Sequence, residues 1–205
     1  MPAAHPRIMK SIAALLFLAV PLFAQEAPPV RTVLAVGGNL SWGIGVSGGR
    51  AVGFSLPCAR PHVAIAARLG NGGGHAYLDA YLMRRVGPEA TEEDEVARAS
   101  LDLPYPFLGW VTLFDDVDLE RGVYWLVLAK PRDKAFSSIN WIAASPMVLE
   151  SSCGARYLGS SAYIFLSDTA DYIPASNFKK EIDPYGFQIA LTEPLEDIVE
   201  CRGQH

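Results

Sequence analysis

The feature that most constrains this fold is an apolar repeat with a period of two. It is clearest in two segments, whose alternating apolar residues are Val63, Ile65, Ala67 and Leu69, then Ala76, Leu78, Ala80 and Leu82. A period of two is typical of β-strands with one buried face. The segments are joined by "NGGG", whose glycines tolerate positive φ, so we predict a β-hairpin.

Further short strand-type runs occur before and after these segments, among them "RTVLAVGG", "RAVGFSLP", "WVTLF", "VYWLVLAK", "NWIAASPMVLES" and "YGFQIALTEP". Both faces of "VYWLVLAK" are apolar, which predicts a central strand. Thr91 and Asp94 form a capping-box pattern that predicts one helical turn, and the rest of the acidic stretch 86–104 reads as a solvated loop. Many short strands with almost no helical pattern predict an all-β fold: a single-domain antiparallel β-sandwich or jelly roll.

The N-terminus has the features of a secretory signal. Arg7 and Lys10 precede the apolar run Ser11–Val20, which is shorter than the roughly 20 residues that a membrane-spanning helix needs. We predict a signal peptide over 1–24, cleaved between Ala24 and Gln25, with an uncleaved anchor as the alternative. A linker (25–32), a β-sandwich domain (33–192) and a polar tail (193–205) follow. The expected product is secreted or periplasmic, with no membrane anchor after cleavage.

Charge and cysteine content exclude some functions. The formal net charge is −5 and no basic cluster is present, so nucleic acid is not an expected partner. Three cysteines in an oxidising compartment predict one disulfide, and spacing alone leaves the pairing open. We predict Cys58–Cys201, because that bridge would tie down the polar tail. There is no C-x-x-C pair to suggest a zinc site, and no cofactor is expected.

Two catalytic-looking motifs overlap in "SWGIGVSGGRAVGFSLP" (41–57), which fits both G-x-G-x-x-G and G-x-S-x-G around Ser47. Both motifs require a helix directly afterwards, whereas the residues that follow have the alternation of a strand. The histidines that could serve as a base, His62, His75 and His205, carry no distinctive signature. We interpret the stretch as a glycine-rich turn between strands.

The candidate binding surface is a stripe on the second arm of the predicted hairpin. His75, Tyr77, Asp79 and Tyr81 alternate there and project from the face opposite the apolar set. Aromatic rings stack on sugars and carboxylates accept hydrogen bonds from hydroxyls, so the stripe suits a glycan. Arg68 on the first arm is expected to pair with Asp79 or to join this surface. The alternative is that a second sheet or the Glu-rich loop covers the stripe.

Other aromatic and acidic residues suggest structural roles. Trp42 and Trp141 are interpreted as core or framework residues. In "DDVDLE" (115–120), Asp116 and Asp118 offer oxygen ligands for calcium, but the glycine and the terminal glutamate of an EF-hand loop are missing. A solvated turn is therefore the expectation.

The order of these motifs resembles a known family. "SWGIGVSGGRAVGFSLP", "HVAIAARLGNGGGHAYLDAYLMRRVGPE", "GVYWLVLAK", "NWIAASP" and "YGFQIALTE" are similar to secreted bacterial all-β domains often carried by proteins with a C-terminal PEP-CTERM sorting signal. The resemblance spans 41–192 and implies an extracellular or surface-associated jelly-roll-like sandwich of no assigned activity. The family's Val-Pro-Glu-Pro anchor and sorting helix are not matched by "TEPLEDIVECRGQH".

Together these patterns predict an exported, non-catalytic β-sandwich that binds a glycan or matrix polymer or serves as a structural surface module. The alternative is a polysaccharide-active enzyme, a glycoside hydrolase or lyase on a jelly-roll scaffold. Such an enzyme needs two facing carboxylates roughly 5 to 10 Å apart. Asp79 is the only acid placed centrally in a predicted strand.

Overall fold

The computed structural model describes residues 29–38, 41–46, 48–74, 76–131, 133–134, 138–162, 172–180 and 186–195. The signal segment with its Ala24–Gln25 cleavage site, and also Ser47, His75, Cys201 and His205, lie outside these ranges. Within them, no helix has the length and hydropathy needed to cross a bilayer.

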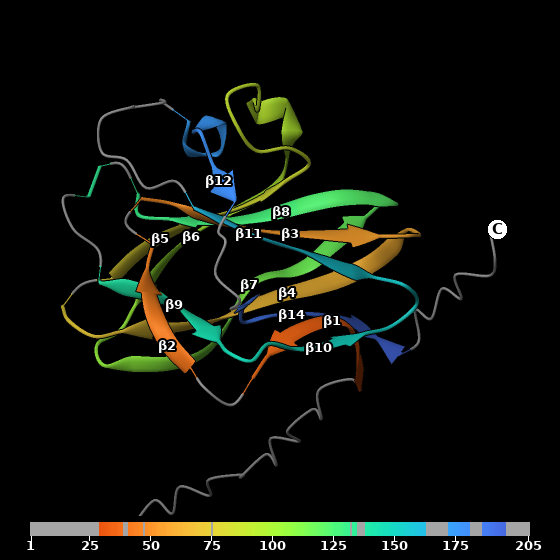
Figure 1. Cartoon of the computed structure of the whole chain (residues 1–205), viewed down its shortest axis with the longest axis horizontal. Coiled ribbons are helices and arrows are strands. Elements are labelled where there is room, and N and C mark those ends of the chain that lie inside the picture. The colour runs from red at the N-terminus through yellow and green to blue at the C-terminus, as the bar shows by residue number, and fades with distance from the viewer. Residues whose placement is uncertain are drawn as a thin grey trace, which may run out of the picture.

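Two antiparallel sheets face each other (Figure 1). Sheet A contains β1 (Val30–Gly37), β2 (Ser41–Gly45), β4 (Arg60–Asn71), β7 (Phe107–Leu119), β9 (Ile139–Ala144), β10 (Val148–Ser151), β13 (Gly186–Phe187) and β14 (Ile189–Pro194). Sheet B contains β3 (Arg50–Leu56), β5 (Ala76–Met83), β6 (Glu95–Leu103), β8 (Gly122–Ala129), β11 (Arg156–Ala162) and β12 (Lys179–Lys180). The predicted all-β antiparallel sandwich is confirmed.

The strand order of sheet B places the strand with two apolar faces in the interior of the sheet. Sheet A runs β10-β1-β14-β4-β9-β13, with β7 paired to β4 and β2 paired to β9. Sheet B runs β12-β11-β3-β8-β5-β6, so β8, the strand with two apolar faces, is central as predicted. β1 and β14 begin and end slightly beyond the 33–192 limits expected for the domain.

The core lies between the sheets and is built from the alternating residues. Sheet A contributes Val63, Ile65, Ala67 and Leu69, and sheet B contributes Ala76, Leu78, Ala80 and Leu82, all fully buried. Burying one such leucine or valine is worth about 1.5 to 3 kcal/mol, which makes this shared interior the main reason for the two-layer fold.

The predicted hairpin between the segments 62–70 and 75–85 is wrong, because β4 and β5 belong to different sheets. The chain crosses between the layers at the "NGGG" turn, which the buried Asn71 holds in place. The Asn71 side-chain amide donates to the carbonyls of Gly74 (3.0 Å), Leu103 (3.2 Å) and Pro104 (2.9 Å). Its Oδ1 accepts from Gly73 N (3.1 Å) and from the Ser138 hydroxyl. Glycines permit either kind of connection, and the bonds to Leu103, Pro104 and Ser138 hold the crossover in place.

Two segments expected to be loops are strands. Part of the acidic stretch, Glu95–Leu103, is β6, which pairs with β5 along its length. The single helical turn is confirmed as the 3₁₀ helix η1 (Glu92–Asp94), where Thr91 N donates to Asp94 Oδ2 at 3.0 Å. The predicted turn at 115–120 is mostly the second half of β7.

The glycine-rich stretch is more regular than expected, because its first part is β2, paired with β9. Gly49 has a φ of +91° in the turn before β3, and strand β3, not a helix, follows. Neither catalytic motif therefore has the helix it requires. Trp141 is fully buried and stacks on Phe187 at 4.8 Å, whereas Trp42 is 41% exposed, so the core interpretation is wrong for Trp42.

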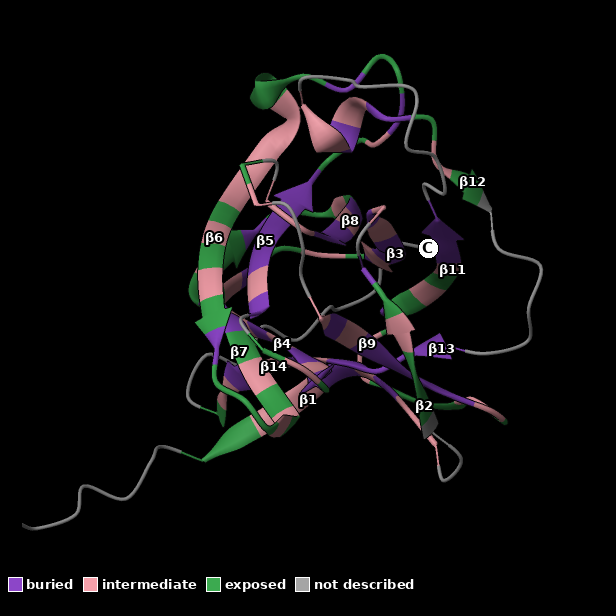
Figure 2. Cartoon of the chain, turned by 90° about the vertical axis from the view of Figure 1, so that its left-hand side faces the viewer, coloured by how far each residue is buried: buried purple, intermediate pink, exposed green. Residues whose placement is uncertain are grey.

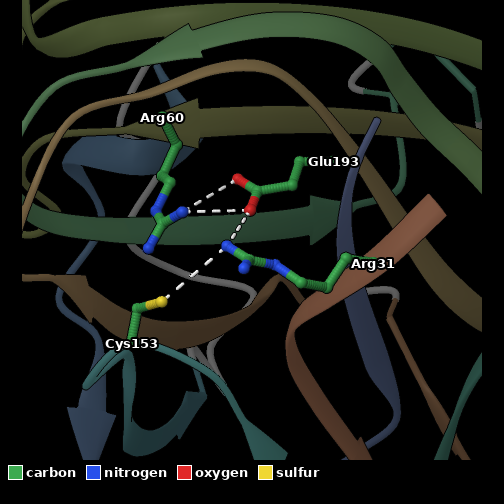
Figure 3. Close-up of polar contacts among 4 residues, drawn as sticks. All are labelled: Arg31, Arg60, Cys153 and Glu193. Carbon is green, nitrogen blue, oxygen red and sulfur yellow. Dashed lines mark hydrogen bonds and ion pairs between the residues drawn. The ribbon is translucent and has the colours of Figure 1, made fainter. Parts of the chain in front are cut away.

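Sheet A contains a buried ion cluster, in which Arg31, Arg60 and Glu193 come from β1, β4 and β14 (Figure 3). Glu193 continues the inward-facing row of β14 and is fully buried, and Arg60 at the start of β4 is 1% exposed. Arg60 Nη1 donates to both Glu193 carboxylate oxygens, at 3.0 and 3.2 Å. Arg31, opposite Glu193 on β1, binds the same carboxylate and lies 3.7 Å from Cys153 Sγ. The cluster ties β1, β4 and β14 together.

Candidate functional site

The predicted stripe lies on the outer surface of sheet B, where we define the β5–β6 face as Tyr77, Asp79 and Tyr81 of β5 with Arg98, Ser100 and Asp102 of β6. Three cross-strand pairs build it: Tyr77 opposite Asp102, Asp79 opposite Ser100, and Tyr81 opposite Arg98. Because the alternate residues of β5 fill the core, this face points outward, as the predicted parity requires. Figure 2 shows β6 at the edge of the sheet, alternating between exposed and half-buried residues.

Asp79 is the centre of a hydrogen-bonded cluster on this face. Its side chain is only 8% exposed, and Oδ1 accepts from the Ser100 hydroxyl at 2.5 Å. Oδ2 accepts from Tyr81 OH at 3.3 Å and from Arg98 Nη2 at 3.4 Å. Burying a carboxylate without partners is costly, so the three donors are needed to offset the loss of hydration and they hold the Asp79 side chain in place. Asp79 therefore positions Ser100 and Arg98.

Tyr81 is covered by residues from another part of the chain. The phenol is 3% exposed and meets the Tyr172 ring edge-on at 5.9 Å. Burial, together with the charge of Asp79, raises the pKa of Tyr81 to about 12. Burial also raises the pKa of Tyr172, whose hydroxyl donates to Glu95 Oε2 at 2.8 Å.

This cover extends over neighbouring strands of sheet B. Tyr172, Ile173 of the 3₁₀ helix η2 (Ile173–Ala175) and Phe178 pack on a small apolar cluster that includes Tyr81 and Val127. The alternative that the stripe is covered is thus correct for Tyr81. The cover comes from the segment 172–178 and, in part, from the predicted acidic stretch 86–104, and not from a second sheet. Val86 packs on the same cluster, and the Arg98 guanidinium lies 4.8 Å from the centre of the Tyr81 ring.

Tyr77 remains half-buried at the open end of the face. Lys134 Nζ lies 4.6 Å from the centre of its ring, in cation–π range. A cavity of about 400 Å³ opens beside this ring. It is lined by Tyr77, Asp79, Arg98, Ser100, Leu101, Asp102, Pro131, Asp133 and Lys134.

Arg68 is not part of this surface. It lies on β4 of sheet A, and its Nη1 donates to Gln188 Oε1 at 3.2 Å. The expected contact with Asp79 fails because the hairpin that would have brought the two residues together does not form. Arg98 of β6 is the cation that pairs with Asp79. Alternation of Ala97, Ala99 and Leu101 with polar residues was the signal that could have revealed this strand.

The other predicted candidates lie elsewhere. His62 is exposed at the irregular start of β4, with Nδ1 2.7 Å from Asp116 Oδ1, and its backbone N–H donates to Asp118 Oδ1 at 3.1 Å. Both aspartates of the calcium alternative therefore contact His62. In the described ranges no group of three or more His, Cys, Asp or Glu side chains is arranged to hold a metal. The Cys58–Cys201 pairing involves a residue outside those ranges and stays a prediction.

The β5–β6 face presents a half-buried aromatic ring beside fixed donors and acceptors in a concave setting. Such a combination suits a ligand rich in hydroxyl groups. Comparisons with protein-family models, with curated proteins and with solved structures find no match. The resemblance to PEP-CTERM-associated domains therefore stays a prediction, and function must be argued from the site.

Proposed function

We propose that this chain is an exported, non-catalytic module that binds an uncharged glycan or matrix polymer on its β5–β6 face. The observation that carries the proposal is the cavity of about 400 Å³ beside Tyr77, where a ring meets preset hydrogen-bonding groups. Export rests on the predicted signal peptide, and the resemblance to secreted surface domains supports the same compartment.

The charges around the cavity favour a neutral ligand. The carboxylates of Asp79, Asp102 and Asp133 share it with the cations of Arg98 and Lys134. Arg98 lies 3.4 Å from Asp79, and Lys134 lies 3.3 Å from Asp133, so both cations are close to carboxylates. A uronate or sulfate would have to compete with these carboxylates, whereas sugar hydroxyls can use both donors and acceptors.

The hydrogen bonds of Asp79 support a positioning role for this carboxylate. A glycoside hydrolase needs one carboxyl group as proton donor and a second as base or nucleophile. Asp79 accepts hydrogen bonds from Ser100, Tyr81 and Arg98, and these three bonds hold its carboxylate in one position. Its role in this proposal is to hold the donors that contact the ligand.

A glycan array with matched aromatic variants tests the proposal. We expect the wild-type protein to bind neutral glycans, and Tyr77→Ala to weaken binding about tenfold to a hundredfold, the range seen when a ring that stacks on a nucleobase is removed. Trp110→Ala is the control, because Trp110 is 50% exposed but lies on β7 of sheet A. Its binding should match the wild type.

Two outcomes would overturn the proposal. One is that no arrayed glycan binds, and the other is that Trp110→Ala weakens binding while Tyr77→Ala does not. Incubating the protein with the bound glycan and measuring new reducing ends tests the non-catalytic part, which product formation would refute.

A further inference from the structure

We infer that the glycan is bound as an extended chain, with consecutive sugars lying along β6, and not as a single terminal sugar. This inference rests on the proposed function and adds the shape of the ligand to it. It is carried by the way three cavities follow one another along the edge of sheet B.

The cavities share residues from one to the next. The central cavity beside Tyr77 shares Asp79, Arg98 and Asp133 with a second one of about 360 Å³, which reaches Tyr172. At its other end the central cavity shares Asp102 with a third one of about 510 Å³, which reaches Tyr105. The three cavities therefore lie next to one another along β6, and we call the row that they form the β6 groove.

The β6 groove is too long for one sugar. Successive strand residues advance by about 3.4 Å, so the distance from Arg98 to Asp102 alone is about 14 Å. The second and third cavities extend it beyond both ends. The groove is also open on one side, because β6 is the outermost strand of sheet B in the described part of the chain.

An aromatic residue is present in each part of the groove. Tyr172 lines the second cavity, Tyr77 the central one and Tyr105 the third. Tyr105 is 61% exposed, so its ring is free of the core and can stack on a sugar. Rings spaced along a groove suit a repeating polymer, since each ring can contact a different unit.

The charges again favour an uncharged chain. Among the described residues, four carboxylates line the groove, from Asp79, Glu92, Asp102 and Asp133, together with the two cations of Arg98 and Lys134. A polyuronate would place a negative charge on every unit along this surface. Like charges at this spacing repel, which disfavours such a ligand.

Oligosaccharides of increasing length test the inference. Cello-, manno- and xylo-oligosaccharides of two to six units, with oligogalacturonates as the anionic probe, are titrated into the full chain by calorimetry. We expect affinity for the neutral series to rise about tenfold or more between two and six units, as each added stacking contact contributes. Tyr105→Ala should weaken binding of the six-unit chain and leave the two-unit chain unchanged.

The controls separate this inference from the proposed function. Trp110→Ala should match the wild type at every length, and melting temperatures should show that Tyr105→Ala is folded. Equal affinity at all lengths, or a six-unit chain insensitive to Tyr105→Ala, overturns the extended chain but leaves Tyr77-dependent binding intact. Tighter binding of the oligogalacturonates overturns the charge argument. If none of these chains binds although the array shows a bound glycan, the extended-chain inference fails alone. If no arrayed glycan binds either, the proposed function fails with it.

Discussion

Two arginine–carboxylate clusters in this molecule have similar chemistry but different surroundings. Glu193 is fully buried and is held by Arg60, which is 1% exposed, and by Arg31. Asp79 is nearly buried as well, but its arginine, Arg98, is 48% exposed and lines two of the cavities. The first cluster joins strands inside sheet A, and the second presents donors to solvent.

Both buried carboxylates pair with arginine, so this pairing alone does not show whether a carboxylate stabilises the fold or supports binding. What distinguishes the clusters is whether the arginine is also accessible from outside. Substitutions in the Glu193 cluster should therefore change stability alone. Substitutions on the β5–β6 face should weaken binding, and the effect should be larger for residues that lie closer to Tyr77.

The largest expected effect is that of Glu193→Gln. This substitution removes the buried charge that pairs with both Arg60 and Arg31, which should lower the free energy of unfolding by about 3 to 5 kcal/mol in urea titrations. The matched control is Glu120→Gln, because Glu120 pairs with Arg84 on the surface at 3.1 Å and is 74% exposed. That change should cost less than about 1 kcal/mol. Equal losses for the two variants would contradict the contrast.

Tyr81→Ala should cause the second-largest loss of stability. It removes a phenol that is 3% exposed and packed on Tyr172, so we expect a loss of about 2 to 4 kcal/mol. Binding by the fraction that remains folded should fall less than in Tyr77→Ala. Thermal unfolding and calorimetry on the same sample measure both quantities. A variant of unchanged stability would show that the 172–178 segment does not cover this side chain.

The free energy of unfolding should also decrease in strong alkali, because Tyr81 loses its proton there. The unfolded chain releases the Tyr81 proton near pH 10.0, whereas burial keeps the folded pKa at about 12. Tyr81 therefore contributes stability that is fully present below pH 10 and is lost as the pH rises toward 12. The loss should reach at most about 2 to 3 kcal/mol, and it should be smaller in Tyr81→Phe. Identical pH profiles for wild type and variant would refute this assignment.

Asp79→Asn should reduce both stability and glycan affinity. The amide keeps the shape but loses the charge that holds Arg98, so we expect a stability loss of about 1 to 2 kcal/mol. Glycan affinity should fall too, because Arg98 and Ser100 lose their anchor. A variant that loses stability but binds normally would place Asp79 with Glu193 as a purely structural carboxylate.

Tyr77→Ala should have the smallest effect on stability, less than about 1 kcal/mol, because the ring is only half-buried. Differential scanning calorimetry measures this alongside the binding loss expected above. A large drop in melting temperature would indicate that Tyr77 is a structural residue and would remove the basis for the binding site.

The alternation of apolar residues within single strands predicted much of the fold, but it did not predict which strands pair with each other. The parity of β5 and the central position of β8 were predictable, because period two and two-faced hydrophobicity are properties of single strands. The pairing of β4 was not, since glycines after Asn71 allow a hairpin or a crossover, and distant carbonyls at Leu103 and Pro104 decide between them.

The candidate site was half-predictable for the same reason. The alternation within β5 predicted that Tyr77 and Asp79 face outward. Their partners come from β6, which we predicted to be a loop because the stretch that contains it is acidic. The misplaced β4 pairing also produced the wrong cation, Arg68 instead of Arg98. Tyr172 could not have been found, because nothing in its local sequence indicates which strand it covers.

Hydrogen–deuterium exchange of the full chain, with and without the neutral oligosaccharide that binds most tightly, tests the central claim most directly. We predict slower amide exchange in peptides from β5, from β6 and from the turn around Tyr105, with no change in β1 and β14 around Glu193. Protection centred on β7 around Trp110, or no change anywhere in the presence of saturating oligosaccharide, would contradict the assignment of binding to the β5–β6 face.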